Sequence, residues 1–291
     1  MILAMRDLQK IVDWLYRQDC RPGSTKWEDL LANAAVQALG KSRIDAERFA
    51  AGGSAKTYWN RVLQLVEEDR DKGRNPLIII HNPKARILGW YADTAGVADT
   101  KEIRRRNCLQ CRSIILRKID ALTDREYEAL GCVVSEQLGA DNVLLTPRGN
   151  EGGIDFFASF HYRSDCHVFH GRGGRLRVVG QSKKYAERVK REKIDLLDKV
   201  IEKVRNRNPE IAKVVPPWFY QATGPIVGWV IGHSGFQEGA ESTARNIGML
   251  LSDSADLAEA FALSRGVGKL GIANCAANLQ SLVAEVIARV R

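Results

Sequence analysis

The chain has 291 residues, of which 44 are lysine or arginine and 35 are aspartate or glutamate, so its formal net charge is +9. Hydrophobic residues make up 45% of the chain, which predicts one large or two ordinary folded domains and argues against a disordered protein. No apolar run approaches the roughly 18 residues that a membrane helix needs, so a protein that spans the membrane with helices is excluded.

Two further features bear on where the protein acts. The first residues combine acids with an amphipathic pattern, so we expect no signal peptide. The six cysteines have no regular spacing, which is typical of proteins in a reducing cytoplasm, where we expect this protein to act.

Charge is unevenly distributed along the chain. Basic residues are concentrated at 101–125 and 171–213, and acidic residues prevail between them at 126–170. Basic segments suit a polyanion such as a nucleic-acid backbone, and an acidic pocket suits a divalent cation. Basic runs also occur on solvated surfaces that bind nothing, so charge alone leaves both interpretations open.

Residues 1–95 are predicted to form a small domain of helices followed by a β-hairpin. Apolar residues recur at helical spacing over 5–18, 25–40 and 54–71. Two β-rich runs then follow, separated by a turn that contains Asn82. Three helices and a hairpin in this order are typical of a winged helix, and a small helical packing or dimerisation domain is the alternative.

The third helix of this domain would enter the major groove of DNA if the domain is a winged helix. Near its start it carries Lys56, Tyr58, Asn60 and Arg61, which can contact a duplex. Among them, Lys56 and Arg61 are the candidate DNA-binding residues.

The rest of the chain is predicted to be a linker and an α/β domain. Residues 96–122 are expected to form a basic linker helix, and 123–291 alternate between helical and strand patterns, which predicts a mixed sheet flanked by helices. We expect helices at 123–139, 187–207, 235–251, 252–263 and 275–290, and strands at 141–145, 154–162, 176–185 and 225–234.

Three polar residues stand out in two of these strands. Asp155 follows a glycine turn at the start of an apolar run, where a carboxylate costs several kcal/mol unless it is paired or binds a metal. Gln181 and Lys183 are two positions apart, so their side chains project from one face of their strand. If the two strands are neighbours, the three side chains converge, and Glu128 on the preceding helix can add a carboxylate.

This set is suited to phosphodiester hydrolysis, which needs a metal ion and a group that handles the attacking water. Asp155 would bind the metal directly, and Gln181 would offer its carbonyl oxygen. Lys183 would orient or help deprotonate the water and offset charge on the phosphate. The alternative is structural: Asp155 caps the turn, and Lys183 pairs with it as a salt bridge.

These residues occur in an order that resembles the catalytic domain of Mrr-type restriction endonucleases, members of the PD-(D/E)xK nuclease superfamily. The resemblance covers about residues 123–265. It consists of Tyr127-Glu128 on a helix, the turn Gly152-Gly153-Ile154-Asp155, the strand Gln181-Ser182-Lys183 followed by Tyr185, and the downstream stretch GWVIGHSGFQEGAESTARNIGMLLSDSADLAEAF.

The resemblance implies a restriction-endonuclease-like fold and a DNA endonuclease that depends on Mg²⁺ or Mn²⁺. It implies that Asp155 is a metal ligand, that Gln181 replaces the usual acid, and that Lys183 is the catalytic lysine. Glu128 would help to hold the metal from its helix. Such enzymes often join a winged-helix reader to the nuclease, in agreement with the interpretation of residues 1–95.

The chain departs from common family members between Asp155 and Gln181, where it is longer. The insertion contains four possible zinc ligands, His161, Cys166, His167 and His170. We prefer an exposed hairpin whose arginines, Arg172, Arg175 and Arg177, meet phosphates. In the glycine turn, Glu151 occupies the place of a family aspartate and is either a support for the metal site or an exposed acid.

A basic helix directly after Lys183 is expected to grip the DNA backbone without reading sequence. The candidate backbone contacts of the α/β domain are Arg172, Arg175, Lys184, Arg188 and Lys190.

The sequence therefore predicts a metal-dependent endonuclease of the type IV restriction class, acting on double-stranded DNA in defence against foreign or modified DNA. Cutting both strands favours a homodimer or a higher oligomer, with one site per strand. The alternatives are a non-catalytic DNA-binding regulator on a nuclease fold, and a nuclease that acts on RNA or branched DNA.

Overall fold

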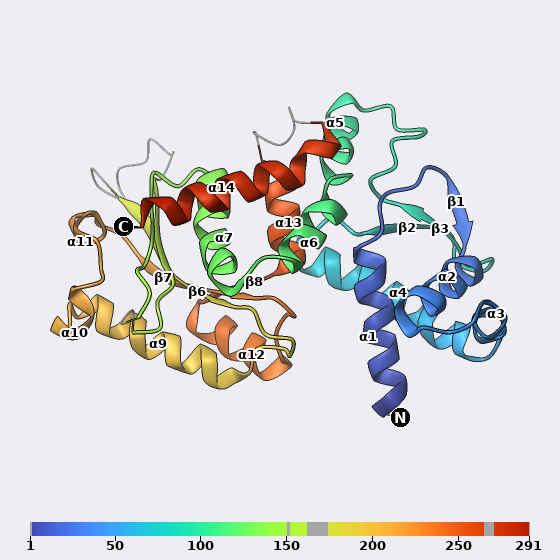
Figure 1. Ribbon diagram of the computed structural model, residues 1–291, viewed down its shortest axis with the longest axis horizontal. Helices are drawn as coiled ribbons and strands as arrows, with labels where there is room; N and C mark the ends of the chain where they lie inside the picture. The colour runs from blue at the N-terminus through green and yellow to red at the C-terminus, as the bar shows by residue number, and fades with distance from the viewer. Residues whose placement is uncertain (1, 150–151, 162–173, 265–270, 291) are drawn as a thin grey trace. The chain divides into compact units, whose positions relative to one another are not determined.

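Figure 1 shows the computed structural model, which describes residues 2–149, 152–161, 174–264 and 271–290. The chain divides into two compact units, one built mainly from Met1–Arg117 and the other from Lys118–Gly266 with Asn274–Arg291. Within the described ranges, no helix has both the length and the apolar character that crossing a bilayer requires.

The first unit packs helices around a small antiparallel sheet in the strand order β1-β3-β2. Its core is formed by buried aromatic and aliphatic residues from the helices and the hairpin, with Trp27 and Leu88 fully buried. The elements are α1 (Ile2–Tyr16), β1 (Ser24–Lys26), α2 (Trp27–Leu39), α3 (Arg43–Ala51), α4 (Ser54–Asp71), β2 (Ile78–Asn82), β3 (Ile87–Trp90), α5 (Thr100–Leu109) and α6 (Arg112–Asp120), the last of which carries the chain into the second unit.

The three expected helices and the hairpin of this unit are all present, with two additions. Ser24 and Thr25, just before the second expected helix, belong to the strand β1, which pairs with β3. The additional helix α3 is capped by Ser42, whose side chain accepts a hydrogen bond from the Asp45 amide at 3.2 Å. Tyr58 is buried against Phe49, which leaves little of its side chain exposed for the expected contact with DNA. The winged-helix assignment stays a prediction.

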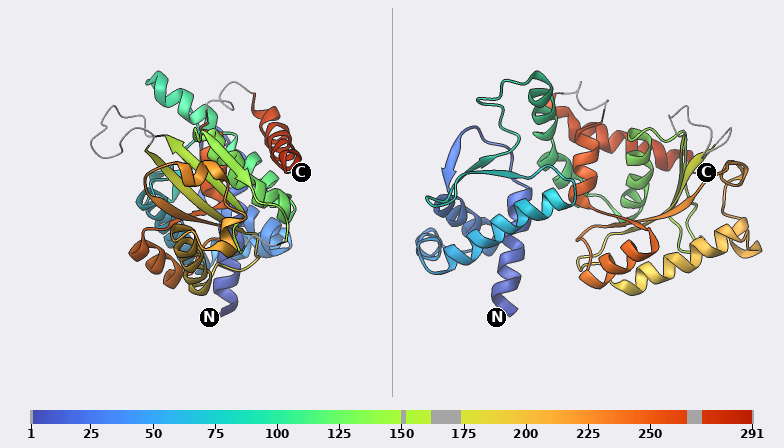
Figure 2. Two further views of the ribbon diagram at one scale, coloured as in Figure 1. Left: turned by 90° about the vertical axis from the view of Figure 1, so that its left-hand side faces the viewer. Right: turned by 180° about the vertical axis from the view of Figure 1, so that it is seen from behind.

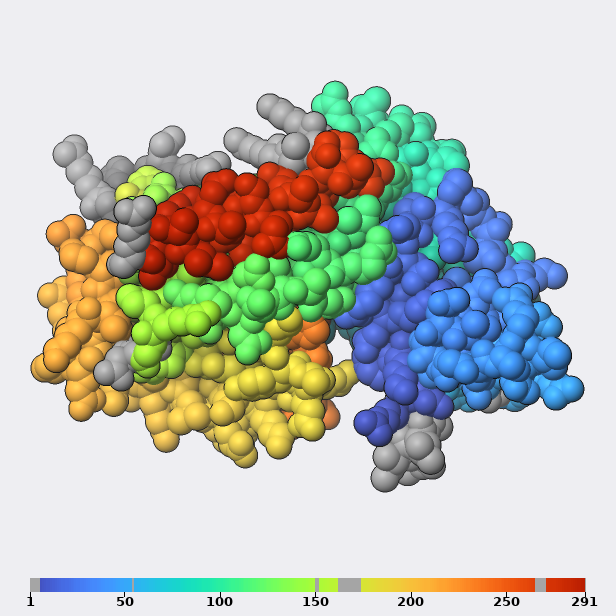
Figure 3. Space-filling view, in the orientation of Figure 1, coloured from blue at the N-terminus to red at the C-terminus, as the bar shows by residue number. Residues whose placement is uncertain are grey.

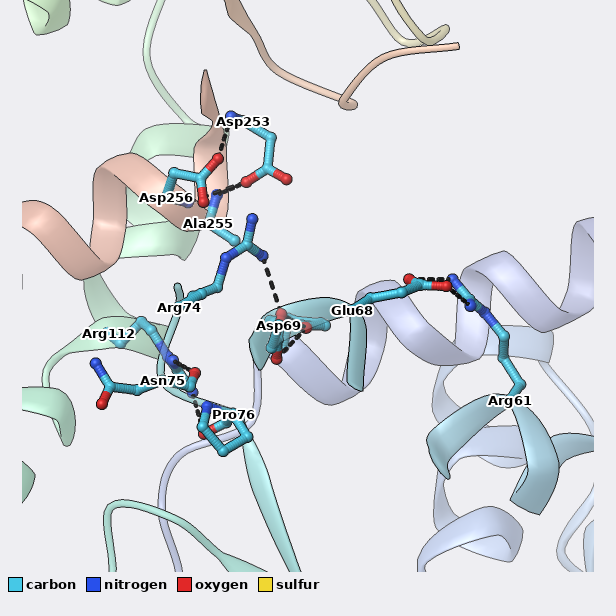
Figure 4. A network of polar contacts seen from close by, with 11 residues as sticks. Arg61, Glu68, Asp69, Arg74, Asn75, Pro76, Arg112, Asp253, Ala255 and Asp256 are labelled. Atoms are coloured by element: carbon cyan, nitrogen blue, oxygen red, sulfur yellow. Dashed lines mark hydrogen bonds and ion pairs between the residues drawn. The ribbon is translucent and has the colours of Figure 1, made fainter. Parts of the chain in front are cut away.

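A buried network of hydrogen bonds and ion pairs lies at the carboxyl end of α4 (Figure 4). The Asp69 carboxylate accepts hydrogen bonds from the Tyr16 hydroxyl at 2.7 Å and forms an ion pair with Arg74 at 3.5 Å. Arg112 donates to the carbonyl oxygen of Asn75 at 2.7 Å, which fixes α6 to the chain that follows α4. Burial raises the pKa of Asp69, while Arg74 and the Tyr16 hydrogen bond oppose that rise.

The second unit is a five-stranded mixed sheet in the order β4-β5-β6-β7-β8. The pairs β4–β5 and β5–β6 are antiparallel, and the pairs β6–β7 and β7–β8 are parallel. Its elements are α7 (Asp124–Gln137), β4 (Asn142–Leu145), β5 (Phe156–His161), β6 (Arg175–Lys183), α9 (Arg191–Arg205), α10 (Pro209–Ala212), α11 (Pro217–Gln221), β7 (Ile226–Gly232), α12 (Glu238–Ile247), β8 (Leu250–Asp253), α13 (Ser254–Ala262) and α14 (Cys275–Arg289). A short 3-10 turn (Ile272–Asn274) directly precedes α14.

Helices cover both faces of this sheet, which confirms the expected α/β class (Figures 1 and 2). The helices α7, α13 and α14 lie on one face, and α9 and α12 lie on the other. On the surface drawn in Figure 3, α14 runs along α7 and shields it. Phe156 points toward α7, where only glycine at Gly131 leaves room for its ring. The neighbouring Phe157 packs into the core on the α9 side.

Two expected helix boundaries in this unit are wrong. The charged helix begins at Arg191 rather than at residue 187, because Val189 is held in an extended bridge to Phe236. The helix expected over 235–251 ends at Ile247, where Gly248 adopts a left-handed φ of 68° and stops it. The released residues form β8, a strand at the edge of the sheet. The expected linker helix is likewise divided, into α5 and α6.

Candidate active site

The strands that carry the candidate residues are neighbours, which is the condition for their side chains to converge. β5 and β6 pair antiparallel, with Phe156 opposite Gly180. Asp155, one residue before β5, continues this pairing through its amide, which donates to the Gly180 carbonyl at 2.9 Å. Asp155 therefore lies at the carboxyl end of β6, where the side chains of Gln181 and Lys183 share one face of the strand.

Backbone contacts hold Asp155 in place from two sides. Its carboxylate Oδ2 accepts a hydrogen bond from the Ser182 amide at 2.6 Å. Its carbonyl oxygen accepts from the Thr146 amide at 2.9 Å and from the Thr146 hydroxyl at 2.9 Å. Asp155 is half-buried, so these contacts orient an acid that still reaches solvent.

The buried Gln181 side chain has a fixed orientation. Its amide nitrogen Nε2 donates to the carbonyl oxygen of Gly153. A backbone carbonyl only accepts hydrogen bonds, so the nitrogen must face it and the amide oxygen must occupy the opposite corner. Gly153 has a φ of 86°, and a side chain there would stand 3.1 Å from Gln181 Nε2. The glycine turn therefore has two functions: it leads the chain into Asp155, and its Gly153 carbonyl accepts the hydrogen bond from Gln181.

Lys183 is the last residue of β6 and is half-buried. Its backbone pairs with Gly232 of β7, and its carbonyl accepts from the His233 amide at 3.0 Å. The main chain of this lysine is therefore fixed by its pairing with the parallel strand β7. The structure brings Lys183 to the same sheet end as Asp155 and Gln181.

Glu128 lies on α7 and is reached through an arginine that sequence reasoning missed. Arg125 donates from one nitrogen to Glu128 at 2.7 Å and from another to the Thr146 carbonyl at 2.6 Å. Thr146 in turn binds the backbone of Asp155, so a short chain of contacts joins Glu128 to Asp155. The spacing of three residues between Arg125 and Glu128, which places them on one helix face, was the available signal.

Tyr127, beside Glu128 in the resembling pattern, has a different environment. Its ring is fully buried, its hydroxyl lies 3.1 Å from the Ser254 hydroxyl, and burial raises its pKa. Tyr127 therefore packs α7 against α13 and the residue after β7, while Glu128 is half-buried and pairs with Arg125.

The donor atoms at this sheet end suit a hard divalent cation. Asp155 and Glu128 supply carboxylate oxygens and Gln181 an amide oxygen, which are the ligand types that Mg²⁺ and Mn²⁺ prefer. Among the described residues, no three His, Cys, Asp or Glu side chains gather at a metal-binding distance. The expected metal ligands are Asp155, Glu128 and Gln181, and only the first two are of these residue types. The metal site therefore stays a prediction.

Four of the expected DNA contacts are engaged within the protein: Arg61, Arg175, Lys184 and Arg177. Arg61 forms an ion pair with Glu68 through both guanidinium nitrogens, and Arg175 pairs with Asp141. Lys184 is half-buried and donates to two backbone carbonyls, as described below. Because these side chains already bind groups within the protein, each is a weaker candidate for a phosphate contact than an exposed cation.

Other expected contacts are exposed. Lys56 lies on the surface of α4, and Arg188 and Lys190 lie in the extended segment before α9 rather than on a helix. Arg177 differs from these, since it donates to the carbonyls of Phe219 and Gly224. Arg172, Glu151, Cys166, His167 and His170 lie outside the described residues, and His161 ends β5.

Comparisons with known proteins give two weak structural likenesses. The structure of MspJI restriction endonuclease in complex with a 27-mer oligonucleotide matches with a TM-score of 0.40 and 17% identity, over 68% of this chain and 40% of that one. The structure of restriction endonuclease FokI matches with a TM-score of 0.33 and 11% identity, over 96% of this chain and 44% of that one. The chain thus spans less than half of either protein. No family model and no curated protein matches the sequence.

Proposed function

We propose that the protein is a metal-dependent endonuclease that hydrolyses phosphodiester bonds in double-stranded DNA. The observation that carries the proposal is the arrangement at one end of the sheet. There the Ser182 amide orients Asp155, the Gly153 carbonyl orients Gln181, and Lys183 ends the same strand. The Mrr-type resemblance of the sequence supports the same assignment.

Each side chain has a defined part in this proposal. Asp155 and Gln181 would hold Mg²⁺ or Mn²⁺, with Glu128 as a further oxygen donor. The bound cation would neutralise charge on the scissile phosphate and make a water molecule a better nucleophile at neutral pH. Lys183 would donate hydrogen bonds to the phosphate oxygens and orient the attacking water.

The backbone contacts of Asp155 favour this role over a structural one. Catalysis by charge stabilisation requires groups that are fixed before the substrate binds. The Ser182 amide and the two Thr146 contacts hold Asp155 through the backbone of both adjoining strands. A carboxylate held in this way would need little reorganisation when a cation or a phosphate binds.

The biological role that we propose is restriction of foreign or modified DNA, as in type IV systems. Two copies of the chain, with one site for each strand, would produce a double-strand break. The exposed Lys56 on α4 would let the first unit contribute to DNA binding.

The proposal is tested by incubating the purified protein with methylated and unmethylated plasmid, in Mg²⁺ and in EDTA. We expect strand cleavage in Mg²⁺ and none in EDTA, with a preference for one methylation state. Binding without cleavage in any metal would favour a non-catalytic DNA-binding regulator. Cleavage of RNA or branched DNA in preference to duplex would change the substrate but keep the chemistry.

A further inference from the structure

Two adjacent lysines at the end of β6 have different environments. Lys183 belongs to the candidate site, whereas the Lys184 ammonium turns to the end of α6. There Nζ donates to the carbonyl of Asp120 at 3.0 Å and also to the carbonyl of Leu122. The last carbonyls of a helix have no partner within it, and a lysine is well suited to bind them.

Two further contacts tie the same segment to the residues after β7. The His233 amide donates to the Lys183 carbonyl at 3.0 Å. The Ser234 hydroxyl donates to the Tyr185 carbonyl at 2.8 Å. The backbone on both sides of Lys184 is therefore anchored.

The His233 side chain also contacts the end of α6. Its Nε2 lies 3.1 Å from the Asp120 carboxylate, and its ring packs edge-on against Tyr127 with centroids 5.8 Å apart. Asp120 thus contacts Lys184 through its backbone carbonyl and His233 through its carboxylate. The contacts form one closed loop from Lys183 through His233 and Asp120 to Lys184.

We infer that Lys184 and His233 are positioning residues that hold Lys183 against the substrate, and that Lys184 does not bind DNA phosphates. This inference rests on the proposed function in assigning Lys183 to catalysis. The clamp, which we define as Lys184, His233 and Asp120, fixes the strand end from which Lys183 projects. A displacement of about 1 Å at a reacting group can cost about a hundredfold in rate, so the clamp matters even though it touches no substrate.

The test compares Lys184→Met, Lys184→Arg and the control Lys190→Met in the full chain. Lys190 is exposed and precedes α9, so it is a matched lysine outside the clamp. Three quantities are measured: hydrogen exchange of the His233 amide, cleavage of saturating plasmid in Mg²⁺, and the salt dependence of duplex affinity without metal. Thermal unfolding checks that each variant is folded.

For Lys184→Met we expect about tenfold faster exchange at His233, as for the loss of a hydrogen bond to a charged group. Cleavage at saturating DNA should fall about a hundredfold. The salt slope should stay unchanged. Lys184→Arg, which can still donate to both carbonyls, should restore both exchange protection and cleavage, and Lys190→Met should leave the His233 exchange as it is.

Unchanged exchange at His233 in Lys184→Met would overturn the clamp, whatever the activity. So would a loss of about 0.9 in the slope of log K against log salt, which marks a lost phosphate contact. If the wild-type protein does not cleave DNA at all, the proposed function fails, while the exchange measurement still decides whether the clamp exists.

Discussion

Asp69 in the first unit and Asp155 in the second are both acids in apolar surroundings, and the protein satisfies them differently. Asp69 is 3% exposed and lies between the Tyr16 hydroxyl and the Arg74 guanidinium. Asp155 is half-buried, at a strand end, and its carboxylate is oriented by the Ser182 amide. The first acid is enclosed by its partners, and the second is partly exposed to solvent.

The difference separates a structural acid from a candidate functional one. A buried ion pair that loses one member leaves an uncompensated charge, so its removal lowers stability. An acid oriented by backbone at an accessible strand end can be replaced with less effect on the fold. Substitution of Asp69 should therefore lower stability, whereas substitution at the site of Asp155 should lower activity.

The largest effect on stability is expected for Asp69→Ala. It removes the partner of Arg74 and the acceptor of the Tyr16 hydroxyl, and we expect the unfolding free energy to fall by about 3 kcal/mol or more. Denaturant unfolding followed by fluorescence measures the change. An unchanged midpoint would remove the distinction between the two acids.

Lys183→Met should affect activity instead. Loss of one preorganised donor to a developing charge costs about a hundredfold to a thousandfold in rate. The lysine is half-buried at a strand end, so the unfolding midpoint should stay close to that of the wild type. Plasmid cleavage under saturating conditions measures the first quantity, and normal cleavage by the variant would rule out the proposed role.

Tyr16→Phe should have a smaller effect on the first unit. It removes only the hydroxyl that donates to Asp69 at 2.7 Å. The expected loss of stability is about 1.5 kcal/mol, the usual value for a hydrogen bond to a charged group. A loss as large as that of Asp69→Ala would mean that Arg74 contributes little to the network.

The smallest effect is expected for Lys56→Met, on the exposed surface of α4. If this helix lies along a duplex, the slope of log K against log salt should fall by about 0.9 for the lost phosphate contact. The substitution should change neither cleavage of saturating DNA nor stability. An unchanged slope would favour the alternative of a packing or dimerisation unit.

The sequence was sufficient to predict that Asp155, Gln181 and Lys183 converge if their strands are neighbours, and β5 and β6 do pair. Strand alternation fixes which side chains share a face, and the glycine turn before Asp155 fixes where its strand begins. The orientation of the Asp155 carboxylate by the Ser182 amide could not be predicted, because it depends on the register between the two strands.

The environment of Lys184 was also beyond sequence reasoning. A lysine in a basic run is ordinarily exposed, and nothing local indicates that carbonyls 62 and 64 residues away lie within its reach. The same limit applies to β8: the apolar pattern of α12 runs on through Leu250 and Leu251, although Gly248 has already ended the helix. The missed helix α3 did have a local signal, namely Ser42 followed three residues later by Asp45.

The most direct test of the central claim is single-turnover cleavage of a plasmid by the wild-type protein and by Asp155→Asn, purified side by side. Asparagine keeps an acceptor for the Ser182 amide but lacks the charge that a divalent cation needs. We predict cleavage by the wild-type protein in Mg²⁺, and a rate at least about a thousandfold lower for the variant, equivalent to about 4 kcal/mol. Equal rates for the two proteins would contradict the account, because the nuclease activity would then arise elsewhere.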